Sequence, residues 1–95
     1  MDNKQLAKVF KALSHHNRME LFREIVKSEE KNYETGKCCM LTGICKCMNI
    51  GAPTISHHLK ELVNAGLIIT EKKGKFLTAR VNKDVIEQVN KLFDL

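Results

Sequence analysis

The sequence predicts a mainly α-helical protein with one small β-hairpin. Two observations carry this prediction. Apolar residues recur at helical spacing in several segments, which is typical of amphipathic helices packed on a common core. Towards the C-terminus, two β-rich runs flank Lys73-Gly74, which is typical of a hairpin turn. Because a chain of 95 residues has room for one modest hydrophobic core, we expect a single domain over residues 1–95.

Two helices are indicated before residue 28. The first is expected over residues 3–13, and Ser14 or His15 is a candidate cap for the second. Residues 28–37 are polar and contain a glycine, so we expect a loop there. The apolar residues of the first helix are Leu6, Val9, Phe10 and Leu13. Those of the second form a wider face, made of Met19, Leu21, Phe22, Ile25 and Val26.

Another pair of helices is expected after the polar segment. Thr42 is a candidate cap for a short third helix, and residues 49–52 predict a tight turn. Pro53 suits the first position of a fourth helix, because its missing N–H costs nothing there. We expect this helix to run from Pro53 to Ala65 and to stop at Gly66. Its inward residues are Ile55, Leu59 and Leu62.

The remaining segment predicts two strands and a last helix. The strands are expected over Leu67–Lys72 and Lys75–Val81, and Asn82 or Asp84 is a candidate cap for the helix. The apolar residues of this helix are Val85, Ile86, Val89, Leu92 and Phe93. They cover more surface than a small monomer buries, and exposed apolar patches mark partner sites. We therefore expect the first and fifth helices to form a homodimer interface.

This order of short helix, tight turn, second helix and β-hairpin is that of a winged helix-turn-helix. A helix enters the major groove of DNA when its outer face is polar and its inner face is anchored. The predicted fourth helix has that division, and the hairpin tip adds cations that reach the DNA backbone. The candidate DNA-binding residues are Thr54, Ser56, His57, Lys60, Lys72, Lys73 and Lys75.

The charge distribution agrees with a polyanionic partner. The formal net charge is +5 and the sequence pI is about 9.1. Residues 52–81 carry five cations against two anions. We therefore expect double-stranded DNA as the partner. A two-fold symmetric dimer would place two recognition helices on a pseudo-palindromic operator.

The segments Pro53–Leu62 and Asn64–Ile68 resemble the recognition helix and strand entry of the arsenic-sensing repressor (ArsR/SmtB) family. Residues 10–18 resemble the junction of that family's first two helices, although the family has Asp-Pro where His15-His16 stand here. The resemblance covers nearly the whole chain and implies a dimeric repressor that leaves its operator when an inducer binds. By position, Thr54, Ser56 and His57 become candidates for groove contacts. His58 either bonds a phosphate or supports the helix from beneath.

Four cysteines lie within ten residues, and they are Cys38, Cys39, Cys45 and Cys47. Thiolates bind soft ions such as Zn(II), Cd(II), Pb(II) or As(III), so the cluster is a candidate metal or metalloid site. The family resemblance implies a Cys-x-Cys sensor near this place, and Cys45-Lys46-Cys47 has that form. Without gaps, however, the family's pair aligns near Met40 and Thr42.

Two other roles therefore stay open for the thiols. Cys38 and Cys39 are candidates for a redox or persulfide switch together with Cys45. Cys47 is also a candidate small core residue, which is the usual fate of a buried cysteine. Some family members bind Zn(II) or Ni(II) between their C-terminal helices. Residues 83–95 contain no histidine, so that site is not expected here.

Several function classes are not expected. No run approaches the roughly 18 apolar residues of a membrane span, and the N-terminus lacks the apolar stretch of a signal peptide. We therefore expect a cytoplasmic protein. No nucleophile triad, phosphate-binding glycine loop or Cys-x-x-Cys motif is present, so we do not expect an enzyme. A winged-helix protein-interaction module remains the main alternative to a DNA-binding repressor.

Overall fold

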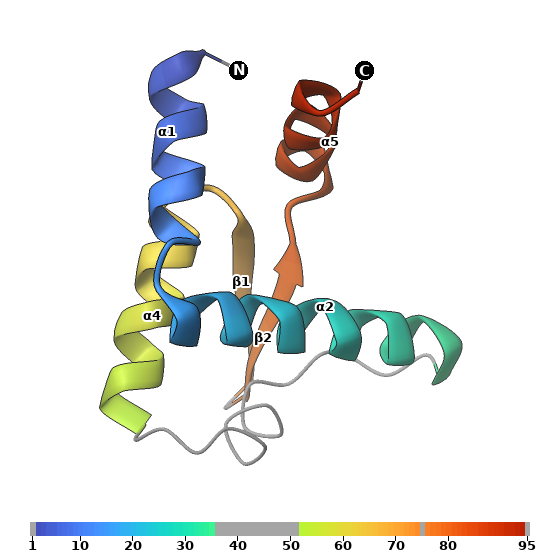
Figure 1. Cartoon of the computed structure of the whole chain (residues 1–95). Coiled ribbons are helices and arrows are strands. Elements are labelled where there is room, and N and C mark those ends of the chain that lie inside the picture. The colour runs from blue at the N-terminus through green and yellow to red at the C-terminus, as the bar shows by residue number, and fades with distance from the viewer. Residues whose placement is uncertain (1, 36–51, 75, 95) are drawn as a thin grey trace.

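A computed structural model describes residues 2–35, 52–74 and 76–94 of the chain. The prediction of a mainly helical protein with one hairpin is confirmed (Figure 1). The elements, in chain order, are α1 (Asn3–Ala12), α2 (His16–Thr35), α4 (Ala52–Asn64), β1 (Ile68–Lys73), β2 (Phe76–Val81) and α5 (Lys83–Leu92). None of the helices in the described ranges is long and apolar enough to span a membrane.

Local hydrogen bonds define the turn between α1 and α2. The Asp2 side chain caps α1 by accepting from the backbone N–H of Gln5 at 2.9 Å. The Ser14 hydroxyl donates back to the Lys11 carbonyl at 2.7 Å, so it closes α1. His15 caps the start of α2, because its Nδ1 atom accepts from the backbone N–H of Asn17 at 3.2 Å. Of the two candidate caps for α2, the structure therefore selects His15.

The prediction of a loop over residues 28–37 is wrong for residues 28–35. There α2 continues as a helix to Thr35, and residues 36 and 37 lie outside the described ranges. The polar residues Glu and Lys are good helix formers, and the segment contains no glycine or proline before Gly36. Polarity alone therefore did not mark the end of the helix.

The predicted third helix and most of the turn after it lie in residues 36–51, outside the described ranges. The turn was expected to include residue 52, but Ala52 is the first residue of α4. Pro53 is consequently the second helical residue, one position later than expected. Its missing N–H is still harmless there, since the first four N–H groups of a helix have no partner inside the helix.

One hydrophobic core joins all the described elements. The apolar stripe of α4 faces inward as predicted, with Leu62 fully buried. Figure 1 shows α2 crossing the hairpin, with α4 packed beside it. Burying such aliphatic side chains is the main favourable contribution to folding. The core residues are Val9, Ala12, Leu21, Ile25, Ile55, Leu59, Leu62, Ala65, Leu67, Ile68, Ala79 and Val85.

The end of α4 is a Schellman motif, as the glycine at position 66 predicted. Gly66 has φ +82°, and its N–H donates to the Val63 carbonyl at 3.0 Å. The N–H of Leu67 donates to the Leu62 carbonyl at 3.1 Å. The Leu67 carbonyl in turn accepts from the N–H of Asn82 at 2.9 Å. Through these two hydrogen bonds, Leu67 connects the end of α4 to the residue before α5, and its side chain is fully buried.

The hairpin is antiparallel, with a register that runs from Ile68 opposite Val81 to Lys73 opposite Phe76. Lys73 is therefore a strand residue. The prediction that Lys73 and Gly74 lie between the strands is wrong by one position. The pairing leaves only residues 74 and 75 for the connection, which is a common hairpin loop length. Gly74 has φ +62°, a value that glycine adopts without strain.

The last helix is only partly covered. Asn82 occupies the cap position, but its side chain makes no capping hydrogen bond. Val85 is buried and Val89 packs against the core, whereas Leu92 is 51% and Phe93 64% exposed. The Phe93 ring meets the Phe10 ring of α1 edge to face, with centroids 6.1 Å apart. An apolar edge therefore runs from α1 to the end of α5.

Candidate nucleic-acid interface

The exposed face of α4 carries the polar residues that the sequence singled out. Thr54, Ser56, His57 and Lys60 are exposed, while Ile55, Leu59 and Leu62 on the opposite face are buried. The buried stripe fixes the helix on the core, so the polar side chains are held in a defined orientation. These groups donate hydrogen bonds and match the requirements of a helix that lies in the major groove.

The hairpin supplies a second basic element next to α4. Lys72 is exposed on β1. Lys73 is the last residue of β1, and Lys75 lies outside the described ranges. The Thr78 hydroxyl donates to the Glu71 carbonyl at 2.9 Å, which adds a cross-strand bond to the hairpin. The strand arrangement thus carries Lys72 towards the tip of a braced two-stranded ribbon.

His58 differs from the polar residues Ser56, His57 and Lys60 of α4 because it is buried. Its side chain is only 4% exposed, and it shares the inward stripe with Ile55 and Leu62. Its ring lies 4.8 Å from the His15 ring and 6.0 Å from the His57 ring, measured between centroids. Of the two roles that the resemblance left open, this burial fits support of the helix better than a phosphate contact.

The environment of His58 favours its neutral form. Neither ring nitrogen has a hydrogen-bond partner in the described part of the chain. Burial lowers the pKa of His58, and the nearby His15, Arg18 and His57 lower it further. A proton on this imidazole would place a charge in an apolar site that already faces a cation.

Arg18 is a site residue that the sequence reasoning did not single out. Its Nη1 atom donates to the Ala12 carbonyl at 3.2 Å, so it caps the end of α1 from the first turns of α2. Its Nε atom is buried and has no partner among the described residues. The available signal was the resemblance at residues 10–18, which ends on this arginine.

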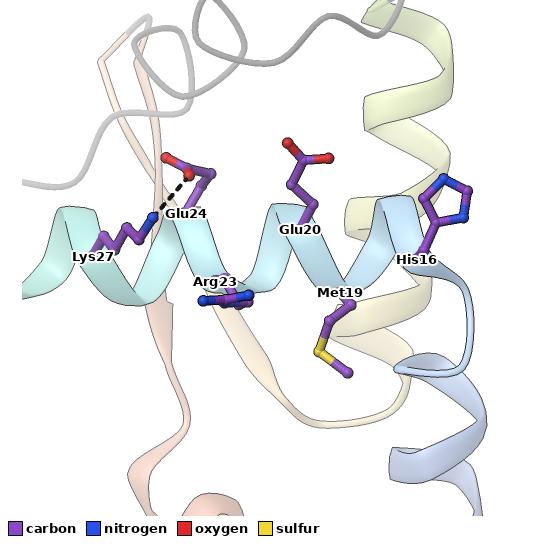
Figure 2. Close-up of a pocket in the computed structure, with 6 residues that line it drawn as sticks. All are labelled: His16, Met19, Glu20, Arg23, Glu24 and Lys27. Carbon is purple, nitrogen blue, oxygen red and sulfur yellow. Dashed lines mark ion pairs between the residues drawn. The ribbon is translucent and has the colours of Figure 1, made fainter.

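A cavity of about 330 Å³ lies along α2. Figure 2 shows its walls, where Glu24 forms an ion pair with Lys27 at 3.6 Å. The lining residues are His16, Met19, Glu20, Arg23, Glu24 and Lys27. Two carboxylates among them make this surface a poor site for DNA phosphates.

The candidate thiol site cannot be built from the described residues. Cys38, Cys39, Cys45 and Cys47 all lie in residues 36–51, outside the described ranges. Within the described ranges, no three histidine, cysteine or carboxylate side chains are placed to hold a metal ion.

The chain matches a known domain family and several known proteins. A helix-turn-helix domain family matches residues 13–71. The arsenical resistance operon repressor of Staphylococcus xylosus is 26% identical over 95 residues, which cover 100% of this chain and 83% of that protein.

Solved structures share the fold. An ArsR-like transcriptional regulator from Rhodococcus sp. RHA1 superposes with a TM-score of 0.75 at 21% identity, over 96% of this chain and 77% of the other. The homodimeric winged helix-turn-helix DNA-binding domain of a possible ArsR-family regulator from Mycobacterium bovis gives 0.71 at 19% identity, over 95% and 75%. The matched family spans more than half of the sequence, and the winged fold extends over nearly all of it. The chain therefore belongs to the helix-turn-helix domain family, and its fold is the winged helix-turn-helix of these ArsR-like structures.

Proposed function

We propose that the protein is a transcriptional repressor that binds duplex DNA as a homodimer. The observation that carries this proposal is the division of α4. Its polar residues Thr54, Ser56, His57 and Lys60 are exposed on a helix whose opposite face is buried in the core. Likeness to an arsenical resistance operon repressor supports the same function. Lys72, with Lys73 and Lys75, would contact phosphates beside the groove.

Binding to duplexes tests this proposal against the protein-interaction alternative. A labelled duplex selected from a random library should bind much more tightly than a random duplex of equal length. The logarithm of the affinity should fall linearly with the logarithm of salt concentration, because phosphate contacts release counterions. Absence of salt-dependent binding to any duplex would favour the protein-interaction module.

We expect the second copy to cover the apolar edge made by Phe10, Leu92 and Phe93. These side chains are 39%, 51% and 64% exposed and come from α1 and α5. The homodimeric state of the Mycobacterium bovis neighbour supports this arrangement. Two copies would present two α4 helices to successive major grooves of a pseudo-palindromic site. A monomeric mass at micromolar concentration in sedimentation would contradict it.

We propose that an inducer acts through Cys38, Cys39, Cys45 and Cys47. The clustering of thiols in the sequence and the likeness to an arsenical resistance repressor support a soft ion such as As(III). Such an ion releases DNA only if it binds more tightly to the conformation with low DNA affinity. A coupling of about 1–3 kcal/mol between the two sites is typical of such regulation.

Titration of the DNA complex separates the candidate inducers. Reduced protein on its selected duplex is exposed to arsenite, Cd(II), Pb(II) or Zn(II), and separately to a persulfide or a mild oxidant. The double variant Cys45→Ser, Cys47→Ser should retain DNA binding and lose the response. Release by the oxidant alone would replace the ion with a redox switch, and no release by any agent would leave the cysteines with a structural role.

A further inference from the structure

All four histidines of the chain gather at one corner of the molecule. His15 and His16 belong to the junction of α1 and α2, and His57 and His58 belong to α4. The His15 ring stacks on the His16 ring with centroids 5.5 Å apart, and its other neighbour is His58 at 4.8 Å. This histidine corner therefore joins the start of α2 to the helix that we assign to the DNA groove.

His58 is the only member of the corner that is buried, since His15, His16 and His57 are exposed. Both of its nitrogens lack a hydrogen-bond partner in the described ranges. A neutral imidazole tolerates such a site at moderate cost, whereas an imidazolium does not, because a buried charge requires a counter-charge. The charged and titratable groups that act on it are His15 from the α1–α2 turn, Arg18 from α2 and His57 from α4. No carboxylate of the described part is among them.

The position of His58 links this titration to DNA binding. It lies on the inward stripe of α4 and is adjacent in sequence to His57, a proposed groove contact. Because His58 lies on the inward stripe beside His15, a movement of α4 away from the α1–α2 turn would bring its ring to solvent. That movement displaces Ser56 and His57 relative to the rest of the molecule.

The geometry points to a proton-operated control of the recognition helix. Protonation of His58 expels its ring from the contact with His15 and from the neighbourhood of the Arg18 charge, and α4 then loses the orientation that specific DNA binding needs. This inference rests on the proposed DNA-binding function. It adds a regulatory input that is separate from the cysteines.

The direction of the effect follows from proton linkage. The pKa of His58 is lowered where its ring is buried beside His15, which we call the seated state. The state in which α4 has moved and the ring meets solvent, the displaced state, therefore binds more protons. The contribution of neutral His58 to the stability of the packed arrangement is complete above the ordinary histidine pKa of about 6.5. It decreases as the pH falls from there to the folded pKa. One linked proton changes the equilibrium by at most about tenfold per pH unit.

Fluorescence anisotropy at constant ionic strength tests this control. The selected duplex and a random duplex are measured between about pH 8 and about pH 5.5, which spans the titration of histidine. The readout is the ratio of the two affinities, because a change of overall charge with pH alters the attraction to both duplexes and cancels in the ratio. We expect the ratio to fall by roughly three- to tenfold on acidification, within the limit set by one proton.

Two variants locate the effect. His58→Gln removes the titrating group and should give a ratio that no longer depends on pH. His16→Gln makes the same change on a ring that stacks on His15 from outside, and it should retain the wild-type dependence. A wild-type ratio that is flat, or a His58→Gln ratio that still falls, overturns the inference.

A DNA-free measurement keeps the test valid if His58→Gln does not fold or if no duplex binds. In an NMR titration of the wild-type protein, the His58 ring should titrate below its ordinary pKa. The backbone amides of α4 should shift with the same midpoint. Amides of α4 that do not respond at that midpoint overturn the inference. Failure to bind any duplex at about pH 8, where histidine is neutral, instead contradicts the proposed function.

Discussion

The helices α4 and α5 are both amphipathic, but they leave different surfaces uncovered. On α4 the apolar stripe of Ile55, Leu59 and Leu62 is buried in the core, and most of the exposed residues are polar, with Val63 at the rim 36% exposed. On α5 only Val85 is fully buried, and the helix ends in the exposed Leu92 and Phe93. One helix is therefore fixed within the monomer and presents a mainly polar surface. The other leaves apolar side chains exposed at its end, which is the surface that we propose a second copy covers.

The largest effect is expected where α4 meets the core. Leu62→Ala removes a fully buried side chain and should lower the free energy of unfolding by about 2–5 kcal/mol, because a cavity remains. Leu92→Ala is the matched control on α5, where the side chain is half exposed in the monomer. Chemical denaturation at a concentration where the protein is monomeric measures both. Equal losses would remove the distinction between the two helices.

The polar face of α4 is tested by DNA specificity. Ser56→Ala and His57→Ala should each weaken binding to the selected duplex by about 1–3 kcal/mol, if these side chains read base edges. Lys72→Ala, and Lys73→Ala or Lys75→Ala, should instead weaken binding to every duplex and flatten the salt dependence. Equal losses on selected and random DNA for all of these variants would exclude α4 from sequence readout.

The apolar end of α5 is tested by the dimer. Phe93→Ala should weaken dimerisation by about 2 kcal/mol, a value typical of a central aromatic contact, which raises the dimer dissociation constant about 30-fold. The unfolding free energy of the monomer should change little, since Phe93 is 64% exposed there. Analytical ultracentrifugation measures the first quantity. An unchanged dimer would mean that another surface holds the two copies together.

The end of α4 gives the smallest of these effects. Gly66→Ala should cost about 1–2 kcal/mol of stability, because φ +82° is strained for a residue with a Cβ atom. The added atom would lie 3.8 Å from a methyl group of Val85, so steric overlap contributes nothing. Gly66→Asn is the control and should cost less, since asparagine tolerates this conformation better. Thermal unfolding distinguishes the two.

Much of the fold was predictable because its elements are locally encoded. The apolar spacing of α4, the glycine stop at Gly66 and the paired β-rich runs placed each element to within about one residue. The end of α2 was not predictable from polarity, because residues 28–35 are polar and still favour a helix. The hairpin register depended on pairing between strands, which shifted Lys73 from the loop into β1.

Only part of the candidate site could be predicted from the sequence. The exposed residues of α4 follow from helical periodicity, and the same periodicity places His58 three residues after Ile55 and four before Leu62 on the buried stripe. What periodicity does not show is that the His15 ring, far away in the sequence, meets this ring and that the Arg18 charge acts on it. That contact depends on the packing of α2 against α4, which no local pattern encodes.

Leu67 has a consequence for how the molecule opens. Its N–H is bonded to the last turn of α4 and its carbonyl to the residue that precedes α5, while its side chain is fully buried. One bond holds Leu67 to the end of α4, and the other holds it to the residue at the end of the hairpin that precedes α5. In hydrogen–deuterium exchange, the amides of Leu67 and Asn82 should therefore be among the slowest, and they should exchange together. The end of α4, the hairpin and the start of α5 would then open as one cooperative unit.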